Sequence, residues 1–171
     1  GLGRIGQTIA RRLRGFDPKL VYTDLVRADP QVEAALGAAY LSKDELLRTA
    51  DIVILILPYT PQTHYYIGQA GLEKMKRSAV LINIARGSIV DDTALARALK
   101  ERRIWAAGLD VYENEPKVNS ALFELDNVVL SPHIASATEP TRHAMAMLAA
   151  RNGVTALTKG DTPPNVLNPG V

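Results

Sequence analysis

The sequence predicts an α/β fold built on a doubly wound parallel sheet. Short apolar runs alternate with helix-forming stretches along the chain, which is the order that βαβ units produce. The runs at residues 51–57 and 79–84 are continuously apolar, as strands buried on both faces of a parallel sheet should be. The third observation is the stretch Gly1-Leu-Gly-Arg-Ile-Gly6, a glycine pattern that joins a strand to a helix in dinucleotide-binding folds.

The first fifty residues are expected to form three helices and two short strands. Asp29-Pro30 supplies an N-cap and a first helical position, and Gly37 ends that helix. Ser42 and Glu45 have the spacing of a capping box, which starts the next helix. The predicted helices cover residues 5–14, 31–36 and 42–49, and the strands cover 20–23 and 38–40.

The rest of the chain continues the alternation. Asp91 or Asp92 is expected to cap a helix that ends at Lys100, and Trp105 is expected to fill the core between sheet and helices. The predicted strands are 51–57, 79–84, 105–111 and 127–130, with a helical turn at 72–75, a long helix from 139 to about 158 and an irregular tail.

Composition narrows the class of protein. A chain of 171 residues, 47% of them hydrophobic, can bury one good core. The net charge of +2 is small, and its Lys and Arg residues are scattered, which argues against nucleic acid as the main partner. Cysteine is absent, and the apolar run at 52–57 is too short to span a bilayer. We therefore expect a cytoplasmic globular protein without a nucleic-acid or membrane partner.

The glycine pattern predicts a Rossmann-type nucleotide site rather than a plain glycine-rich loop. The helix that follows Gly1, Gly3 and Gly6 could meet a pyrophosphate with its free N–H groups. The next strand ends in Asp24, where a carboxylate can accept the ribose hydroxyls. That carboxylate would repel a 2′-phosphate and so favours NAD over NADP, although Arg27 lies close enough to keep NADP as an alternative.

Three polar residues follow predicted strands in the second half of the chain. Arg86, Glu115 and His133 are distant in sequence, but the carboxyl ends of parallel strands share one edge, where ligands bind. Taken singly, each also fits a surface, turn or structural role. Together they supply a carboxylate clamp, an acid–base group and a carboxylate that orients it. That set suits reduction of a 2-oxo acid beside a nicotinamide.

At this point the sequence resembles a known family. The matching segments are GLGRIG, DIVILILPYTPQTH, LINIARGSIVDDTALARAL, AAGLDVYENEP and SPHIASAT. The chain resembles the NAD-binding half of the D-isomer-specific 2-hydroxyacid dehydrogenases, and is most similar to the branch that reduces glyoxylate, hydroxypyruvate and 2-ketogluconate. The resemblance implies an NAD-dependent oxidoreductase that acts on a small 2-oxo or 2-hydroxy acid and, at full length, forms a homodimer.

The resemblance also implies roles for individual residues. Arg86 matches the arginine that clamps the substrate, His133 the acid–base histidine, and Glu115 the glutamate that pairs with it, whereas Glu113 has the same chemistry in the wrong place. No metal site is implied. For the cofactor, the matching residues are Arg4 and Ile5 at the pyrophosphate, Asp24 at the adenine ribose, Leu57, Pro58 and Thr63 beside the adenosine half, Ile84 and Ala85 near the nicotinamide, and Asp110 at the carboxamide. Asp110 could instead be a strand-end cap.

The start of the chain departs from the family pattern. Members carry a substrate domain and the first strand of the nucleotide domain ahead of the glycines. We expect residues 1–145 to be a dinucleotide-binding domain that lacks its first strand, and 146–171 to be the end of the last helix and a tail that returns toward the substrate domain. We also expect the 171 residues alone to be inactive.

Three alternative functions stay open at the level of sequence. Some relatives keep this fold and act as NAD-sensing corepressors. Phosphoglycerate dehydrogenase is a related enzyme whose shorter forms are compatible with the chain. Formate dehydrogenase also shares these motifs, but it has glutamine where Glu115 stands, which speaks against it.

Overall fold

The computed structural model describes residues 1–159, 162–163 and 165–167. The chain divides into two units, residues 1–132 and residues 133–171. The first unit holds all the strands among the described residues. The predicted division into a dinucleotide-binding domain, residues 1–145, and a tail that returns toward the substrate domain, residues 146–171, stays a prediction.

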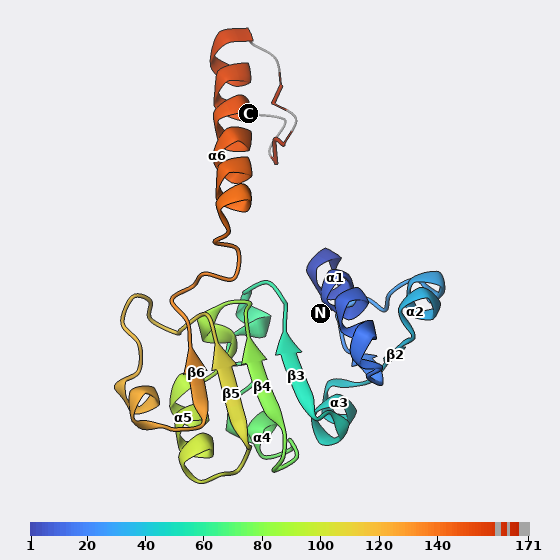
Figure 1. Ribbon diagram of the computed structural model, residues 1–171, viewed down its shortest axis with the longest axis vertical. Helices are drawn as coiled ribbons and strands as arrows, with labels where there is room; N and C mark the ends of the chain where they lie inside the picture. Colours follow the sequence, from blue (N-terminus) through green and yellow to red (C-terminus); the bar gives the residue numbers. More distant parts are fainter. Residues whose placement is uncertain (160–161, 164, 168–171) are drawn as a thin grey trace. The chain divides into compact units, whose positions relative to one another are not determined.

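The centre of the first unit is a four-stranded parallel sheet in the order β3-β4-β5-β6 (Figure 1). Every neighbouring pair is parallel, which confirms the predicted α/β fold. Each strand is shorter than its apolar run, because the ladder stops where the chain turns into the loops. The strands are β3 (Ile52–Leu55), β4 (Val80–Asn83), β5 (Ala106–Leu109) and β6 (Val128–Leu130).

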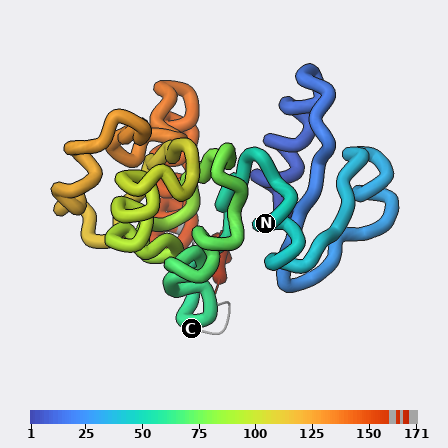
Figure 2. The backbone as a smooth tube through the Cα atoms, turned by 90° about the horizontal axis from the view of Figure 1, so that it is seen from below, coloured from blue at the N-terminus to red at the C-terminus, as the bar shows by residue number. Residues whose placement is uncertain are grey.

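A separate parallel pair is formed by β1 (Leu20–Tyr22) and β2 (Ala38–Tyr40). Figure 2 shows the segment from α1 to β2, in blue, as a lobe to one side of the larger sheet. Within the described residues no strand joins β1 to β3. A doubly wound sheet has its first strand at this position, between its second and fourth.

The helices of the first half begin and end where their caps predict. The Asp29 carboxylate accepts a hydrogen bond from Gln31 N, and Gly37 ends the helix with a φ of 64°. Ser42 and Glu45 form the expected capping box. The helices are α1 (Arg4–Leu13), α2 (Pro30–Leu36) and α3 (Lys43–Thr49), with a 3₁₀ turn η1 (Arg14–Phe16).

Among the remaining helices of the first unit, the predicted bounds of one helical turn are corrected. The helical turn predicted at 72–75 is α4 (Gln69–Leu72), which starts earlier because Gly68 serves as its N-cap. Asp91, not Asp92, caps α5 (Asp92–Lys100) by accepting a hydrogen bond from Ala94 N. Shorter 3₁₀ turns are η2 (Pro61–Thr63), η3 (Gly87–Ile89) and η4 (Ser120–Glu124).

The main core lies between the four-stranded sheet and α5, where Leu81, Leu95, Leu99 and Ile104 are fully buried. The prediction that Trp105 fills this core is wrong, because Trp105 is 64% exposed. In the bend before β5, Ile104 is fully buried in its place, and the side chain of Trp105 faces solvent.

The second unit contains α6 (Glu139–Val154), which continues into the π-helical turn η5 (Thr155–Lys159). Thr138 caps α6 by accepting a hydrogen bond from Thr141 N. Of the helices in the described part of the chain, none has both the length and the apolar character needed to cross a membrane.

Candidate functional site

The glycine stretch lies against the carboxyl end of β3. A Cβ added to Gly1 would stand 2.3 Å from the Ile56 carbonyl oxygen, and one added to Gly6 would stand 2.3 Å from the Gly1 carbonyl oxygen. Neither position can accept a side chain, because both close approaches are to backbone. A Cβ on Gly3 would meet nothing within 4 Å. The loop is therefore packed on two sides and open at Gly3, where a ligand's phosphates could approach the backbone.

The start of α1 is also open. Its N-cap is Gly3, and no side chain caps the helix. Arg4 and Ile5 in the first turn are exposed. An uncapped helix N-terminus beside an open glycine offers N–H groups and a favourable dipole to a negatively charged group. The predicted contact of these residues with the pyrophosphate of a dinucleotide stays a prediction.

Asp24 connects β1 to this loop. Its carboxylate accepts hydrogen bonds from Leu2 N and from Leu25 N, both at 2.8 Å. The predicted ribose-binding carboxylate therefore stands next to the glycine stretch, at the carboxyl end of its strand.

Arg27, the cation that kept NADP as an alternative, has a partner of its own. Its guanidinium makes two hydrogen bonds of 2.9 Å to the two carboxylate oxygens of Glu33. Glu33 also accepts a hydrogen bond from the Tyr22 hydroxyl at 2.7 Å. The Arg27 and Tyr22 hydrogen bonds lower the pKa of Glu33 to about 2. Arg27 is thus held by Glu33 through a bidentate, charge-assisted contact.

The loops that follow β3, β4 and β5 are joined to one another at one edge of the sheet. Tyr65 N donates to Ser88 O at 2.8 Å, and Ile67 N donates to Ile89 O at 3.0 Å. A Cβ added to Gly87 would stand 1.8 Å from the Tyr112 carbonyl oxygen, so the second and third loops are also in direct backbone contact. This edge carries most of the residues that the sequence analysis selected.

The loop after β3 contains Leu57, Pro58 and Thr63. Thr63 is buried, and its hydroxyl donates to Pro58 O at 2.9 Å while it accepts from Thr60 N at 2.7 Å. These bonds close the loop into a compact turn at the carboxyl end of β3. The predicted contact of these residues with the adenosine half of the cofactor stays a prediction.

Arg86 is exposed between two buried neighbours, Ala85 and Gly87. The turn that presents it is fixed by Asn83, which is 1% exposed. Asn83 accepts a hydrogen bond from Ala85 N at 3.1 Å and donates one to Arg86 O at 3.0 Å. Sequence reasoning missed Asn83, although an amide inside the apolar run LINIA was a signal. Ile84, between these residues, is half-buried.

The loop after β5 carries Asp110 and Glu115. Asp110 is buried, and its carboxylate accepts a hydrogen bond from the Ser131 hydroxyl at 2.6 Å. Glu115 accepts a hydrogen bond from Tyr112 N at 2.9 Å and precedes a cis peptide bond to Pro116. Asp110 and Glu115 therefore follow the same strand at the edge where Arg86 lies.

His133 is the first residue of the second unit. Two residues earlier, Ser131 N bonds to Leu109 O at 2.9 Å, so the chain leaves the first unit at the carboxyl end of β6. His133 has a φ of 53°, an uncommon conformation for a residue with a side chain, and such residues concentrate at functional sites. The predicted meeting of His133 with Arg86 and Glu115 stays a prediction.

Asp92 is a buried carboxylate that the sequence analysis considered only as a helix cap. It is 2% exposed, its Oδ2 accepts a hydrogen bond from Glu113 N at 3.0 Å, and its Oδ1 has no partner. Burial raises the pKa of Asp92 to about 6; the Glu113 N–H lowers it, while the charges of Glu113 and Asp91 raise it.

This raised pKa predicts a pH-dependent stability. The folded protein keeps the proton on Asp92 at pH values where the unfolded chain has lost it, so the contribution of Asp92 to the free energy of unfolding falls as pH rises from about 4 to about 6. Asp92→Asn should remove up to about 3 kcal/mol of that fall in the full-length protein. Urea unfolding of variant and wild type across this range measures it, and curves that run parallel would contradict it.

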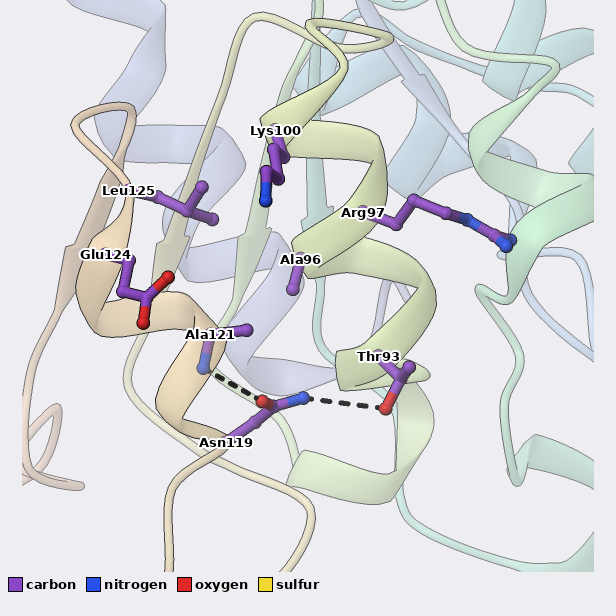
Figure 3. Close-up of a pocket in the computed structure, with 8 residues that line it drawn as sticks. All are labelled: Thr93, Ala96, Arg97, Lys100, Asn119, Ala121, Glu124 and Leu125. Atoms are coloured by element: carbon purple, nitrogen blue, oxygen red, sulfur yellow. Dashed lines mark hydrogen bonds between the residues drawn. The ribbon is translucent and has the colours of Figure 1, made fainter.

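A surface pocket lies on another part of the first unit (Figure 3). Its volume is about 420 Å³, and it lies between α5 and η4. At its rim the Asn119 side chain accepts a hydrogen bond from Ala121 N and donates one to the Thr93 hydroxyl. None of the residues predicted for the cofactor or the substrate lines it. Across the described residues no group of three or more His, Cys, Asp or Glu side chains could hold a metal ion.

Comparison with known families gives a direct match. Residues 1–135 match the model described as D-isomer specific 2-hydroxyacid dehydrogenase, NAD binding domain. The chain belongs to this family. The glycine loop, Asp24 and the three joined loops all lie within the part of the chain that matches this NAD-binding domain.

Relatives of this chain include proteins named as reductases of small oxo acids. A glyoxylate reductase from Thermococcus onnurineus is 49% identical over 98% of this chain and 50% of its own length. The NADPH-dependent glyoxylate/hydroxypyruvate reductase from Sinorhizobium meliloti, solved with NADP and malonate, is 38% identical, with a TM-score of 0.89 over 99% of this chain and 52% of its own. An NAD-complexed D-isomer specific 2-hydroxyacid dehydrogenase from Lactobacillus delbrueckii is 33% identical, with a TM-score of 0.84 over 98% of this chain and 54% of its own. The chain spans about half the length of the curated relatives it matches.

Proposed function

We propose that the full-length protein is an NAD(H)-dependent oxidoreductase that interconverts a small 2-oxo acid and its D-2-hydroxy acid. The activity would be of the glyoxylate, hydroxypyruvate or 2-ketogluconate reductase type. One observation carries the proposal. The glycine loop, the loop that carries the exposed Arg86 and the loop that carries Glu115 are far apart in sequence but lie at the same edge of the sheet. The names of the relatives support the substrate class.

Two observations favour NAD as the cofactor. Asp24 presents a carboxylate beside the glycine loop, where it can accept hydrogen bonds from ribose hydroxyls and repel a 2′-phosphate. Arg27 already pairs with Glu33 through its Nε and Nη2, so its charge is partly balanced before any such phosphate binds. Because relatives occur with NAD and with NADP, this preference belongs to the proposal.

The predicted residues divide the chemistry among them. When bound, the nicotinamide supplies the hydride. Arg86 holds the substrate carboxylate and polarises the carbonyl, and His133 delivers a proton to the carbonyl oxygen. Glu115 favours the imidazolium form and orients the ring, so that a proton is available over a wider pH range.

The remaining predicted residues hold the dinucleotide. Gly1, Gly3, Arg4, Ile5 and Gly6 would surround the pyrophosphate. Leu57, Pro58 and Thr63 would lie beside the adenosine, Ile84 and Ala85 near the nicotinamide, and Asp110 would accept from the carboxamide. The homodimer that the resemblance implies stays a prediction for the full-length protein.

A substrate panel tests the proposal. The full-length protein should reduce glyoxylate, hydroxypyruvate or 2-ketogluconate, and its kcat/KM should be higher with NADH than with NADPH, because a 2′-phosphate would face Asp24. Steady-state kinetics with NADH and with NADPH measures kcat/KM for each acid. The panel also includes 3-phosphohydroxypyruvate, which tests the phosphoglycerate dehydrogenase alternative. A protein that binds NADH and turns over none of these acids would favour the corepressor-like alternative. A clearly higher kcat/KM with NADPH would overturn the cofactor preference alone.

A further inference from the structure

One contact between two loops of the site has no part in the proposed chemistry. The Tyr65 hydroxyl donates a hydrogen bond to the Glu113 carboxylate, across 48 residues of sequence. Tyr65 follows Thr63 by two residues in the loop after β3, and Glu113 precedes Glu115 by two in the loop after β5. The contact therefore joins the predicted adenosine loop to the predicted catalytic loop.

Tyr65 is held firmly for an exposed residue. Its φ of 47° lies in the left-handed region, which a side chain rarely adopts unless its surroundings require it. Its N–H donates to Ser88 O at 2.8 Å, and its ring stacks on His64 with centroids 3.9 Å apart. These contacts hold Tyr65 in the position from which its hydroxyl reaches Glu113.

Glu113 is the point at which the catalytic loop is anchored. Its N–H donates to Asp92 at 3.0 Å, and the preceding N–H, of Tyr112, donates to Glu115 at 2.9 Å. Two adjacent amides are thus bound by two carboxylates. The Glu115 side chain is oriented by the N–H of Tyr112, and the Tyr65 contact holds the next residue, Glu113.

We propose that Tyr65 is a positioning residue for Glu115, an inference that rests on the proposed function. Its hydroxyl, through Glu113, holds the loop that carries Glu115 in place against the loop that carries Thr63. Without this tether Glu115 would sample more orientations and favour the His133 imidazolium less.

The tether itself persists across the pH range of an assay. The hydrogen bond with Glu113 raises the pKa of Tyr65 to about 12, so the hydroxyl remains a donor. The other titratable groups beside this contact are His64, whose ring stacks on Tyr65, and Asp91 and Asp92 at the start of α5. A change in the pH profile on losing the hydroxyl would therefore report on Glu115 and His133 rather than on Tyr65 titrating.

Tyr65→Phe in the full-length protein removes the tether and keeps the ring. The pH above which kcat for reduction declines should fall by about half a unit, because the imidazolium is less favoured. Tyr59→Phe is the matched control, since it removes a hydroxyl from the same loop whose partner is His64 Nδ1, at 3.2 Å. This control should leave the profile where it is. A general loss of packing would lower kcat without moving the profile.

Hydrogen exchange provides a readout that does not need activity. The amides of residues 111–115 should exchange several-fold faster in Tyr65→Phe than in wild type or Tyr59→Phe, because the loop opens more often. The proposal is overturned if exchange and pH profile are unchanged, or if Tyr59→Phe alters both equally. If the wild type shows no reductase activity, the proposed function fails, and the exchange result alone decides whether Tyr65 positions the loop.

Discussion

Replacing His133 with alanine in the full-length protein should lower kcat for 2-oxo acid reduction by about 10³-fold, within the range that a positioned general acid supplies. The carbonyl oxygen would then have no protein group from which to take its proton. The Kd for NADH should change little, because the predicted cofactor contacts come from the glycine loop, Asp24 and the loops after the strands. Steady-state kinetics and a fluorescence titration with NADH measure the two quantities.

His143→Ala is the matched control for this experiment. His143 is exposed on α6, and its replacement should alter neither kcat nor NADH binding. Equal losses of turnover and of NADH affinity in His133→Ala would assign His133 to cofactor binding. Unchanged turnover would remove it from the chemistry altogether.

Gly87→Ala should have the largest effect on stability. The new Cβ would stand 1.8 Å from the Tyr112 carbonyl oxygen and 2.5 Å from Glu113 N, both backbone atoms that no rotamer change can move away. The loops after β4 and β5 would have to separate, which should cost at least about 3 kcal/mol of the free energy of unfolding. Because Arg86 and Glu115 lie on these loops, kcat/KM should fall as well.

Urea unfolding and kinetics of the full-length protein measure both effects of Gly87→Ala. Gly15→Ala is the control, because a Cβ there would meet nothing within 4 Å and its backbone does not require glycine. It should leave stability and activity close to wild type. If Gly87→Ala were as stable as Gly15→Ala, the close packing of the two loops would be wrong.

Much of the fold was readable from short stretches. The continuous apolar runs predicted β3 and β4, and the capping residues at 29 and 42 predicted where α2 and α3 begin. The exposure of Trp105 could not be predicted from the sequence, because either Ile104 or Trp105 could have entered the core, and in the structure it is Ile104. The role of Asn83 was likewise overlooked, because its side chain acts through hydrogen bonds to Ala85 N and Arg86 O, which exist only in the folded turn.

The sequence by itself determined the α/β class, the helix caps and the chemistry of the candidate residues, because these signals lie within a few neighbouring positions. Only the tertiary structure decided which loops touch, that Arg27 is occupied by Glu33, and that Tyr65 reaches Glu113. The physical reason is the parallel topology. It brings the carboxyl ends of β3, β4 and β5 to one edge, where residues tens of positions apart make contacts that no local pattern encodes.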